Sequence, residues 1–183
     1  MTTVDPSFDA LLARANRGDV GTDEALALFD TLPAVRPEEM LGEWRGEEFP
    51  TGHPMDGLLA ATGWAGKRFD DADRVHPLLF WDATRTSTFA VDPSRVPMTL
   101  PTPAALRRPW LHRVITAARP LLATSRHTAR LRTTEFRGVS TATMIYDARP
   151  INDLFRRVSE TRLLGLMDHR GDPAPYFFVL HRP

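Results

Sequence analysis

The polar residues best suited to chemistry gather in one short segment, Thr51-Gly52-His53-Pro54-Met55-Asp56. His53 and Asp56 are an imidazole and a carboxylate three positions apart, a pairing that can transfer a proton or anchor a polar ligand. The alternative is structural: His53 caps a short helix, and Asp56 lies in its first turn, where the helix dipole favours negative charge. If the chain is an enzyme, we expect His53 to act with Asp56 or Glu135 as acid and base.

Residues elsewhere in the chain are candidate contacts for a ligand. Lys67 is the one lysine among 23 basic residues and would suit an anionic head group, although an ordinary exposed strand lysine is the alternative. His76 precedes a proline within a predicted strand, where a lone histidine is more often structural. We expect five residues near a ligand: Trp64, Lys67, His76, Arg132 and Tyr146.

Other kinds of site lack their sequence signals. The six histidines include no pair at helical ligand spacing, HExxH is absent, and the chain has no cysteine, so we expect no metal site and no disulfide. Nucleotide-binding glycine loops and the GxSxG nucleophile motif are also absent. We therefore expect no cofactor on these grounds.

Charge is unevenly distributed although the net charge is zero. Residues 1–56 hold twelve acids and four arginines, whereas residues 93–134 hold eight arginines and no acid. We expect the two segments to neutralise each other in the fold; an anion-binding or membrane-surface stretch is the alternative. The basic stretch lacks the interleaved aromatic residues of single-strand binders, so we expect no nucleic-acid partner.

Apolar spacing predicts helices first and short strands afterwards. Helical spacing over 8–16 and 22–32 predicts two N-terminal helices, and Pro33 ends the second. Further helices are expected at 54–62, 106–122 and 151–158. Short runs bounded by turn residues predict strands at 40–47, 64–70, 75–82, 86–92, 130–137, 139–147, 162–168 and 176–181.

About eight strands joined mainly by hairpins predict an α+β, mainly β protein. Eight antiparallel strands can close into a barrel that holds one small ligand. The strand at 130–137 has polar residues on both faces, which favours a partly polar barrel interior. We expect residues 1–37 to form a helical extension packed on a single barrel domain at 38–183.

One ordered set of motifs identifies a family. Gly42-Glu43-Trp44-Arg45-Gly46 is followed by Pro50–Leu58 and by Trp64-Ala65-Gly66-Lys67-Arg68-Phe69, and this order resembles the GXWXG domain, here about 38–92. Phe136-Arg137-Gly138, Met144–Asp147, Pro150–Asp153 and Leu164–Asp168 resemble the DUF4334 domain, here about 125–182. A first strand with this glycine–tryptophan pattern is also similar to that of lipocalin-like barrels.

The likeness to lipocalin-like barrels implies a role for three features. Trp44 would plug the closed end of the barrel, with flanking glycines that let its ring pack against backbone. A helix at 54–62 would cover the open end as a lid. Nitrobindin haem barrels begin similarly, so haem held by a histidine of the last strand, such as His181, is a minor alternative.

Together these observations predict a barrel that carries a small hydrophobic or amphipathic molecule, such as a fatty acid, an isoprenoid or a polyketide-like compound. The alternatives are a cofactor-independent isomerase, cyclase or hydrolase in the same cavity, and a haem protein. The N-terminus lacks a secretory signal and no apolar run approaches the roughly 20 residues of a membrane span, so we expect a cytoplasmic protein without stable membrane insertion. A homodimer is left open.

Overall fold

The computed structural model describes residues 6–96 and 110–183. Its helices and 3-10 turns are α1 (Pro6–Ala15), α2 (Thr22–Thr31), η1 (Pro37–Met40), α3 (Leu58–Thr62), η2 (Pro93–Arg95), α4 (Trp110–Ala117) and α5 (Arg119–Leu122). Its strands are β1 (Gly42–Glu48), β2 (Trp64–Phe69), β3 (Val75–Trp81), β4 (Thr88–Ala90), β5 (Ala129–Phe136), β6 (Val139–Tyr146), β7 (Ile151–Ser159), β8 (Arg162–His169) and β9 (Tyr176–His181).

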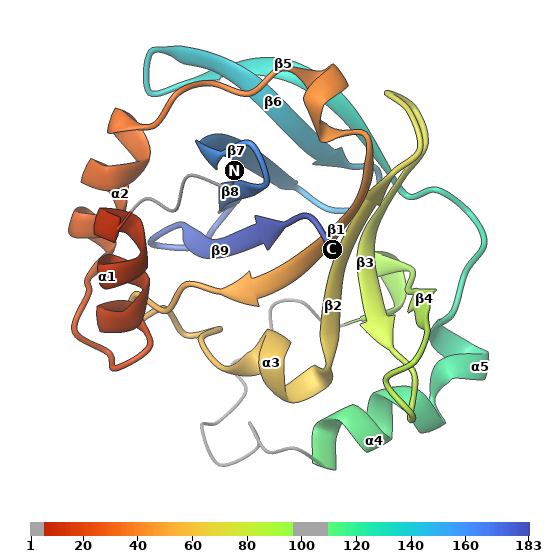
Figure 1. Cartoon of the computed structure of the whole chain (residues 1–183). Coiled ribbons are helices and arrows are strands. Elements are labelled where there is room, and N and C mark those ends of the chain that lie inside the picture. Colours follow the sequence, from red (N-terminus) through yellow and green to blue (C-terminus); the bar gives the residue numbers. More distant parts are fainter. Residues whose placement is uncertain (1–5, 97–109) are drawn as a thin grey trace.

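Eight of these strands close into an antiparallel ring. The order is β2-β1-β9-β8-β7-β6-β5-β3, and β3 pairs back with β2 (Figure 1). The predicted mainly β protein, closed around about eight antiparallel strands, is therefore confirmed.

The seam between β3 and β5 is the weakest pairing of the ring. Only Val75 and Ala129 are paired there, whereas β5 and β6 pair along their whole length. The later half of β3 pairs instead with β4, from Leu79 opposite Ala90 to Trp81 opposite Thr88. Hydrogen bonds between β3 and β5 therefore contribute little to closure of the barrel.

Helices α1 and α2 pack on the outside of the barrel (Figure 1). Their buried Phe8 and Phe29 share one apolar cluster with Leu164 of β8 and with Phe177 and Val179 of β9. The apolar stripes predicted for these two helices are thus the surfaces that cover the outward side chains of β8 and β9.

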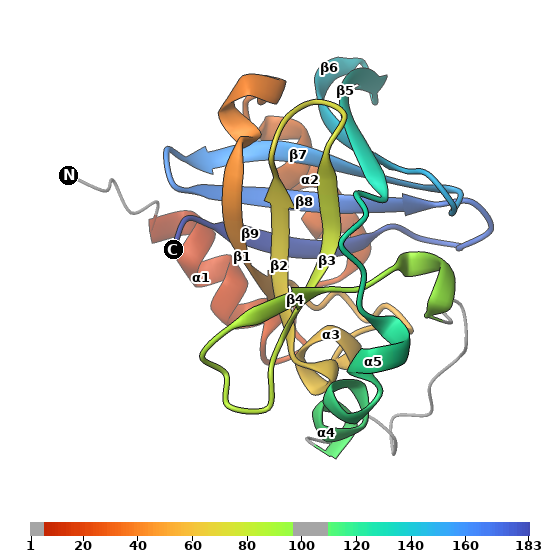
Figure 2. The ribbon, with the colours of Figure 1, turned by 90° about the vertical axis from the view of Figure 1, so that its right-hand side faces the viewer.

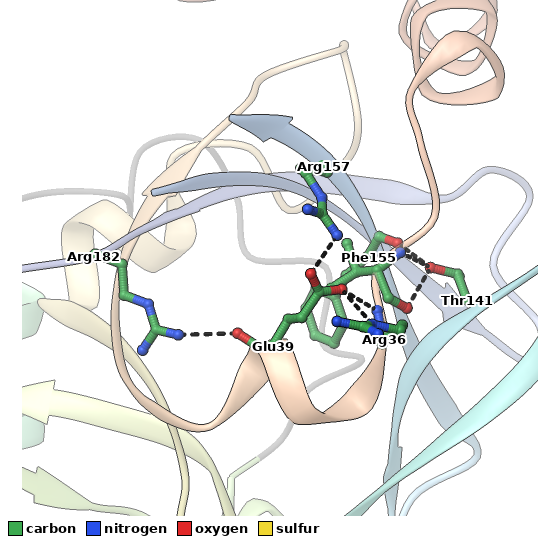
Figure 3. A network of polar contacts seen from close by, with 7 residues as sticks. Arg36, Glu39, Thr141, Phe155, Arg157 and Arg182 are labelled. Carbon is green, nitrogen blue, oxygen red and sulfur yellow. Dashed lines mark hydrogen bonds and ion pairs between the residues drawn. The ribbon is translucent and has the colours of Figure 1, made fainter. Parts of the chain in front are cut away.

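One end of the barrel is closed by η1, which precedes β1 (Figure 2). Figure 3 shows how Glu39 anchors this turn: its carboxylate accepts from Arg157 Nη2 at 2.6 Å, and its carbonyl accepts from Arg182 Nη2 at 2.9 Å. Trp44 is 1% exposed, and its indole N–H donates to the carbonyl of Met40 at 2.7 Å. The tryptophan of the motif therefore lies beneath the closed end.

Two glycines explain why tryptophans fit at this place. A Cβ on Gly46 would lie 2.2 Å from the ring of Trp64, and a Cβ on Gly66 would lie 1.9 Å from the carbonyl oxygen of Trp44. Gly66 also has φ +132°, which side chains rarely adopt. These positions admit only glycine because a ring and a backbone carbonyl occupy the space of a Cβ.

The predicted helix at 151–158 is wrong, because these residues form β7. Both faces of β7 are covered: Phe155 points to the barrel core, and Leu154 points to the cluster beneath the helices. Apolar side chains on both faces of a strand imitate helical spacing, and Pro150 strengthened the wrong interpretation.

Two other predicted helices are shorter than expected. The helix predicted at 54–62 is turn as far as Gly57, and α3 follows. Within the predicted 106–122 helix, α4 ends at Ala117 and α5 has Pro120 in its first turn, while 106–109 lie outside the described residues.

Ion pairs link the acidic N-terminal segment to arginines other than those expected. Asp30 pairs with Arg137 and Glu39 with Arg157, each at 2.6 Å, and Asp9 pairs with Arg162. All three arginines follow residue 134, outside the basic stretch. That stretch pairs elsewhere, for example Arg130 with Asp147 at 2.9 Å.

Among the helices of the described residues, none is both long and apolar enough to cross a membrane.

We predict that Gly46→Ala lowers the free energy of unfolding by about 1–3 kcal/mol, the usual cost of overpacking. The added methyl group must displace the ring of Trp64, since no positive φ is involved. Urea unfolding measures the change. Gly21→Ser is the control, because a Cβ there meets nothing within 4 Å, and it should cost less than about 0.5 kcal/mol since serine is at least as favourable as glycine at this N-cap. Equal stability of the two variants would contradict the packing described.

Candidate functional site

A cavity lies inside the barrel, with about 290 Å³ of empty space when its open mouth is included. Its wall combines apolar, aromatic and charged side chains. The lining residues are Met55, Leu59, Trp64, Lys67, Leu78, Tyr146, Asp153, Met167, Tyr176 and Phe178.

The centre of the cavity holds a buried ion pair. Lys67 Nζ lies 2.7 Å from Asp153 Oδ2, and the two side chains are 3% and 1% exposed. Lys67 also donates to the carbonyl of Pro77 at 3.1 Å. Burial raises the pKa of the Asp153 carboxyl, and the charge of Lys67 acts in the opposite direction. The pair is net neutral as a unit, so each charge depends on the other.

Aromatic rings surround the lysine of this pair. Lys67 Nζ lies 4.9 Å from the ring centroid of Phe178, 5.6 Å from that of Trp64 and 5.7 Å from that of Tyr146. These distances fit cation–π contacts. Burial, together with neighbouring Asp153, raises the pKa of the Tyr146 hydroxyl well above its usual range. The hydroxyl therefore stays protonated at neutral pH and faces Asp153 as a hydrogen-bond donor.

Two buried polar atoms of the lining have no hydrogen-bond partner among the described residues. They are Oδ1 of Asp153, an acceptor, and Nε1 of Trp64, a donor. Buried polar atoms are nearly always paired in folded proteins, with protein, water or a ligand. A small molecule that offers both a donor and an acceptor would complete both.

Glu48 holds residues 57–59 in place at the start of α3, which lies at the end of the barrel away from η1 (Figure 2). Its carboxylate accepts from the backbone N–H groups of Gly57 at 3.1 Å and Leu59 at 2.8 Å, and from the hydroxyl of Tyr176 at 3.0 Å. Burial raises the pKa of Glu48, while these hydrogen bonds lower it. Because Met55 and Leu59 line the cavity, the segment expected to act as a lid does form part of its wall.

His53 and Asp56 hold the loop that leads into this lid. Asp56 Oδ2 accepts from the backbone N–H groups of Thr51, Gly52 and His53 at 2.8–3.0 Å. His53 Nδ1 accepts from the N–H of Met55 at 3.1 Å, and its ring packs edge-on against Tyr176. The structure thus brings the two residues together as supports of the loop before the helix, and neither caps α3, which begins at Leu58 and whose N-cap, Gly57, has no side-chain hydrogen bond. Glu135 is exposed on β5 and is not among the residues that line the cavity.

Three of the five expected ligand contacts line the cavity, namely Trp64, Lys67 and Tyr146. Arg132 is exposed and bonds to the carbonyl of Ala72 and to Asp73. His76 is 3% exposed and packs against His127, with ring centroids 4.4 Å apart. The polar interior of the barrel therefore comes from Lys67 and Asp153, and the charged residues of β5 contribute nothing to it.

The cavity does not fit a haem group. The space it encloses is far smaller than a haem, and within the part of the chain that the structure describes no histidine is among its lining residues. His181, the histidine considered for iron, is paired in the sheet with Arg45 and Arg162.

Asp153 is not among the residues predicted from the sequence, because the apolar spacing of 151–158 predicts a helix. In a strand, Asp153 shares a face with Ile151 and Phe155, both of which belong to the barrel core. Alternation over these three positions was the available signal, and it predicts an acid that points inward. An inward acid in turn requires an inward cation, and Lys67 was the sole lysine.

Two family models match the chain, one described as "GXWXG protein" over residues 27–84 and one as "Domain of unknown function (DUF4334)" over residues 127–182. The chain is also similar to a protein from Thermomonospora curvata known from a crystal structure, with 33% identity and a TM-score of 0.66. That match covers 96% of this chain and 99% of the other. No curated protein matches. The motifs quoted from the sequence are thus confirmed as family motifs.

We predict that Lys67→Met lowers the free energy of unfolding by about 3–5 kcal/mol, because it leaves Asp153 as a buried, unpaired charge. Lys67→Met combined with Asp153→Leu should recover most of this loss, since similar apolar residues replace the whole pair. Denaturant unfolding of the single and double variants measures the coupling.

The control for this cycle is Arg130→Met, which breaks a pair whose side chains are 51% and 43% exposed. It should cost less than about 1 kcal/mol. A cost for Lys67→Met no larger than that of the control would show that the buried pair is not energetically coupled.

Proposed function

The chain belongs to the family that joins a GXWXG domain to DUF4334, and from that premise we propose that its barrel binds one small, neutral, mostly apolar molecule. The observation that carries the proposal is a pair of buried polar atoms in an aromatic cavity, Asp153 Oδ1 and Trp64 Nε1, neither of which has a hydrogen-bond partner in residues 6–96 and 110–183. Mostly apolar pockets with a few placed polar groups are typical of small-molecule sites.

The charge of the cavity favours a neutral ligand. Lys67 is already compensated by Asp153 at 2.7 Å, so a carboxylate ligand would add a buried anion without a free cation. Burying an unpaired charge is strongly unfavourable. Fatty acids are therefore disfavoured, and a hydroxyl group, which can donate to Asp153 Oδ1 and accept from Trp64 Nε1, suits both atoms.

The size of the cavity favours a compact ligand. The space that the cavity encloses holds little more than one water molecule, far less than the roughly 300–1,000 Å³ typical of ligand pockets, so a ligand can enter only if lining side chains such as Met55 and Leu59 move apart. A short alcohol requires the smallest movement of this wall, a short isoprenoid alcohol or a small polyketide-like compound requires more, and a long acyl chain requires the most. The role that follows is that of a cytoplasmic carrier or binding protein.

An enzyme in the same cavity is the second candidate. Asp153 and Tyr146 are buried titratable groups whose pKa values are raised, and such groups are common at sites of proton transfer. In this version Asp153, Tyr146 and Lys67 take the place of His53 acting with Asp56 or Glu135. It differs from a carrier in one observable: the bound molecule would change mass during incubation, and Asp153→Asn would stop the change.

The proposal is tested with matched alcohols and carboxylates of equal chain length. We expect short- and medium-chain alcohols to bind in calorimetry and to raise the melting temperature, with each carboxylate at least about tenfold weaker, or about 1.4 kcal/mol. Trp64→Phe should weaken alcohol binding because the ring stays while the indole N–H is lost. Trp81→Phe is the control, since Trp81 stacks on Arg45 and is not a lining residue.

Native mass spectrometry of protein from several expression hosts provides a second measurement. A small neutral molecule that co-purifies with the wild type, and less with Trp64→Phe, would support the proposal. Carboxylates that bind as tightly as alcohols would contradict the neutral ligand. Absence of both alcohol binding and any co-purified molecule would reject the binding function itself.

A further inference from the structure

A second cluster of chemically capable side chains lies apart from the cavity. Asp70 follows β2, His76 is the second residue of β3, and His127 precedes β5. One ligand atom from each of the three lies within 4.8 Å of the other two. Asp70 and His76 lie on either side of the turn between β2 and β3, whereas His127 comes from a segment far along the chain, which is why the spacing of the histidines does not reveal the cluster.

We propose that Asp70, His76 and His127 form a binding site for a divalent transition-metal ion of the Zn²⁺, Co²⁺ and Ni²⁺ class. Two imidazoles and one carboxylate are ligands that these metals share, and hard ions such as Mg²⁺ and Ca²⁺ prefer sites made wholly of oxygen. The site is separate from the proposed ligand cavity and does not rest on it.

A buried ligand atom without a partner is the independent observation behind this site. His76 is 3% exposed, and its Nδ1 has no hydrogen-bond partner in the part of the chain that the structure describes. The ring of His127 lies 4.4 Å from the ring of His76. Neutral imidazole binds a metal through the lone pair of one ring nitrogen, and His76 Nδ1 is available for this role.

The other two ligands need only small movements. His127 Nε2 lies 2.9 Å from Asp70 Oδ2, close to the separation of about 3–3.4 Å expected for two ligands with bonds of about 2.1 Å to one metal. His127 and Asp70 are 28% and 33% exposed, so an ion and water can reach the site from solvent. Three protein ligands leave a coordination position open to water, which favours an exchangeable ion.

Arg68 is the charged group that opposes an ion here. It pairs with His76 in the sheet, and its Nε lies 3.1 Å from Asp70 Oδ1. The arginine thus occupies one carboxylate oxygen and leaves Oδ2 for the metal. Its side chain is 42% exposed, so solvent screens its charge.

A bound ion would reinforce the weakest pairing of the barrel. It would join the end of β2, the start of β3 and the segment entering β5, next to the single pair Val75–Ala129. An ion that binds only the folded chain also raises its stability by mass action.

The test uses tag-free protein, treated with a chelator and then titrated with Zn²⁺ by calorimetry and with Co²⁺ by visible absorption. We expect one ion per chain, ligand-field bands from the bound Co²⁺, and a higher melting temperature with Zn²⁺. His127→Ala should weaken binding by more than about a hundredfold, beyond the 10–100-fold typical of losing an outer partner. Asp70→Asn, which keeps the shape of the side chain, should also weaken it.

The control variant is His169→Ala, which removes a histidine paired with a single carboxylate, Asp172, at 3.0 Å. It should bind Zn²⁺ like the wild type. Unfolding curves without metal establish that each variant is folded. Absence of saturable binding, binding that persists in His127→Ala, or equal loss in His169→Ala would each overturn the site.

Discussion

The ion pair between Lys67 and Asp153 is the interaction on which the interior of this barrel depends. Each charge is buried, and each would be strongly unfavourable alone. The pair therefore dictates its surroundings: the carbonyl of Pro77 accepts from the lysine, and three aromatic rings surround it. A barrel filled only with apolar side chains would need none of these groups. The side chains around Lys67 and Asp153 therefore serve to stabilise the two charges.

The GxWxG motif shapes this interior although none of its residues is among those that line the cavity. Trp44 packs beneath η1 at the closed end, and Gly46 makes room for the ring of Trp64, which is a wall of the cavity. The motif thus positions one aromatic wall and seals one end, without itself lining the cavity. A family motif can therefore be diagnostic of the fold while the chemical groups lie elsewhere.

Much of the fold was predictable from the sequence, and the site only in part. Hairpin-connected strands with period-two alternation gave the barrel, and Trp64, Lys67 and Tyr146 were correctly placed near its interior. Asp153 escaped because β7 is covered on both faces and so imitates a helix. Arg132 was misplaced since a strand polar on both faces does not reveal which face points inward. His76 and His127 meet only through the β3–β5 seam, which no local pattern encodes.

The two halves of the site come from the two matched segments of the chain. Lys67 lies within residues 27–84, and Asp153 and Tyr146 lie within 127–182. Each segment contributes one buried charge, Lys67 or Asp153, and that charge is compensated by the other segment. Exchanging either segment for a strand set that lacks the matching charge would leave the other charge buried and uncompensated. The two matched segments of this chain therefore depend on each other through electrostatics before any ligand is considered.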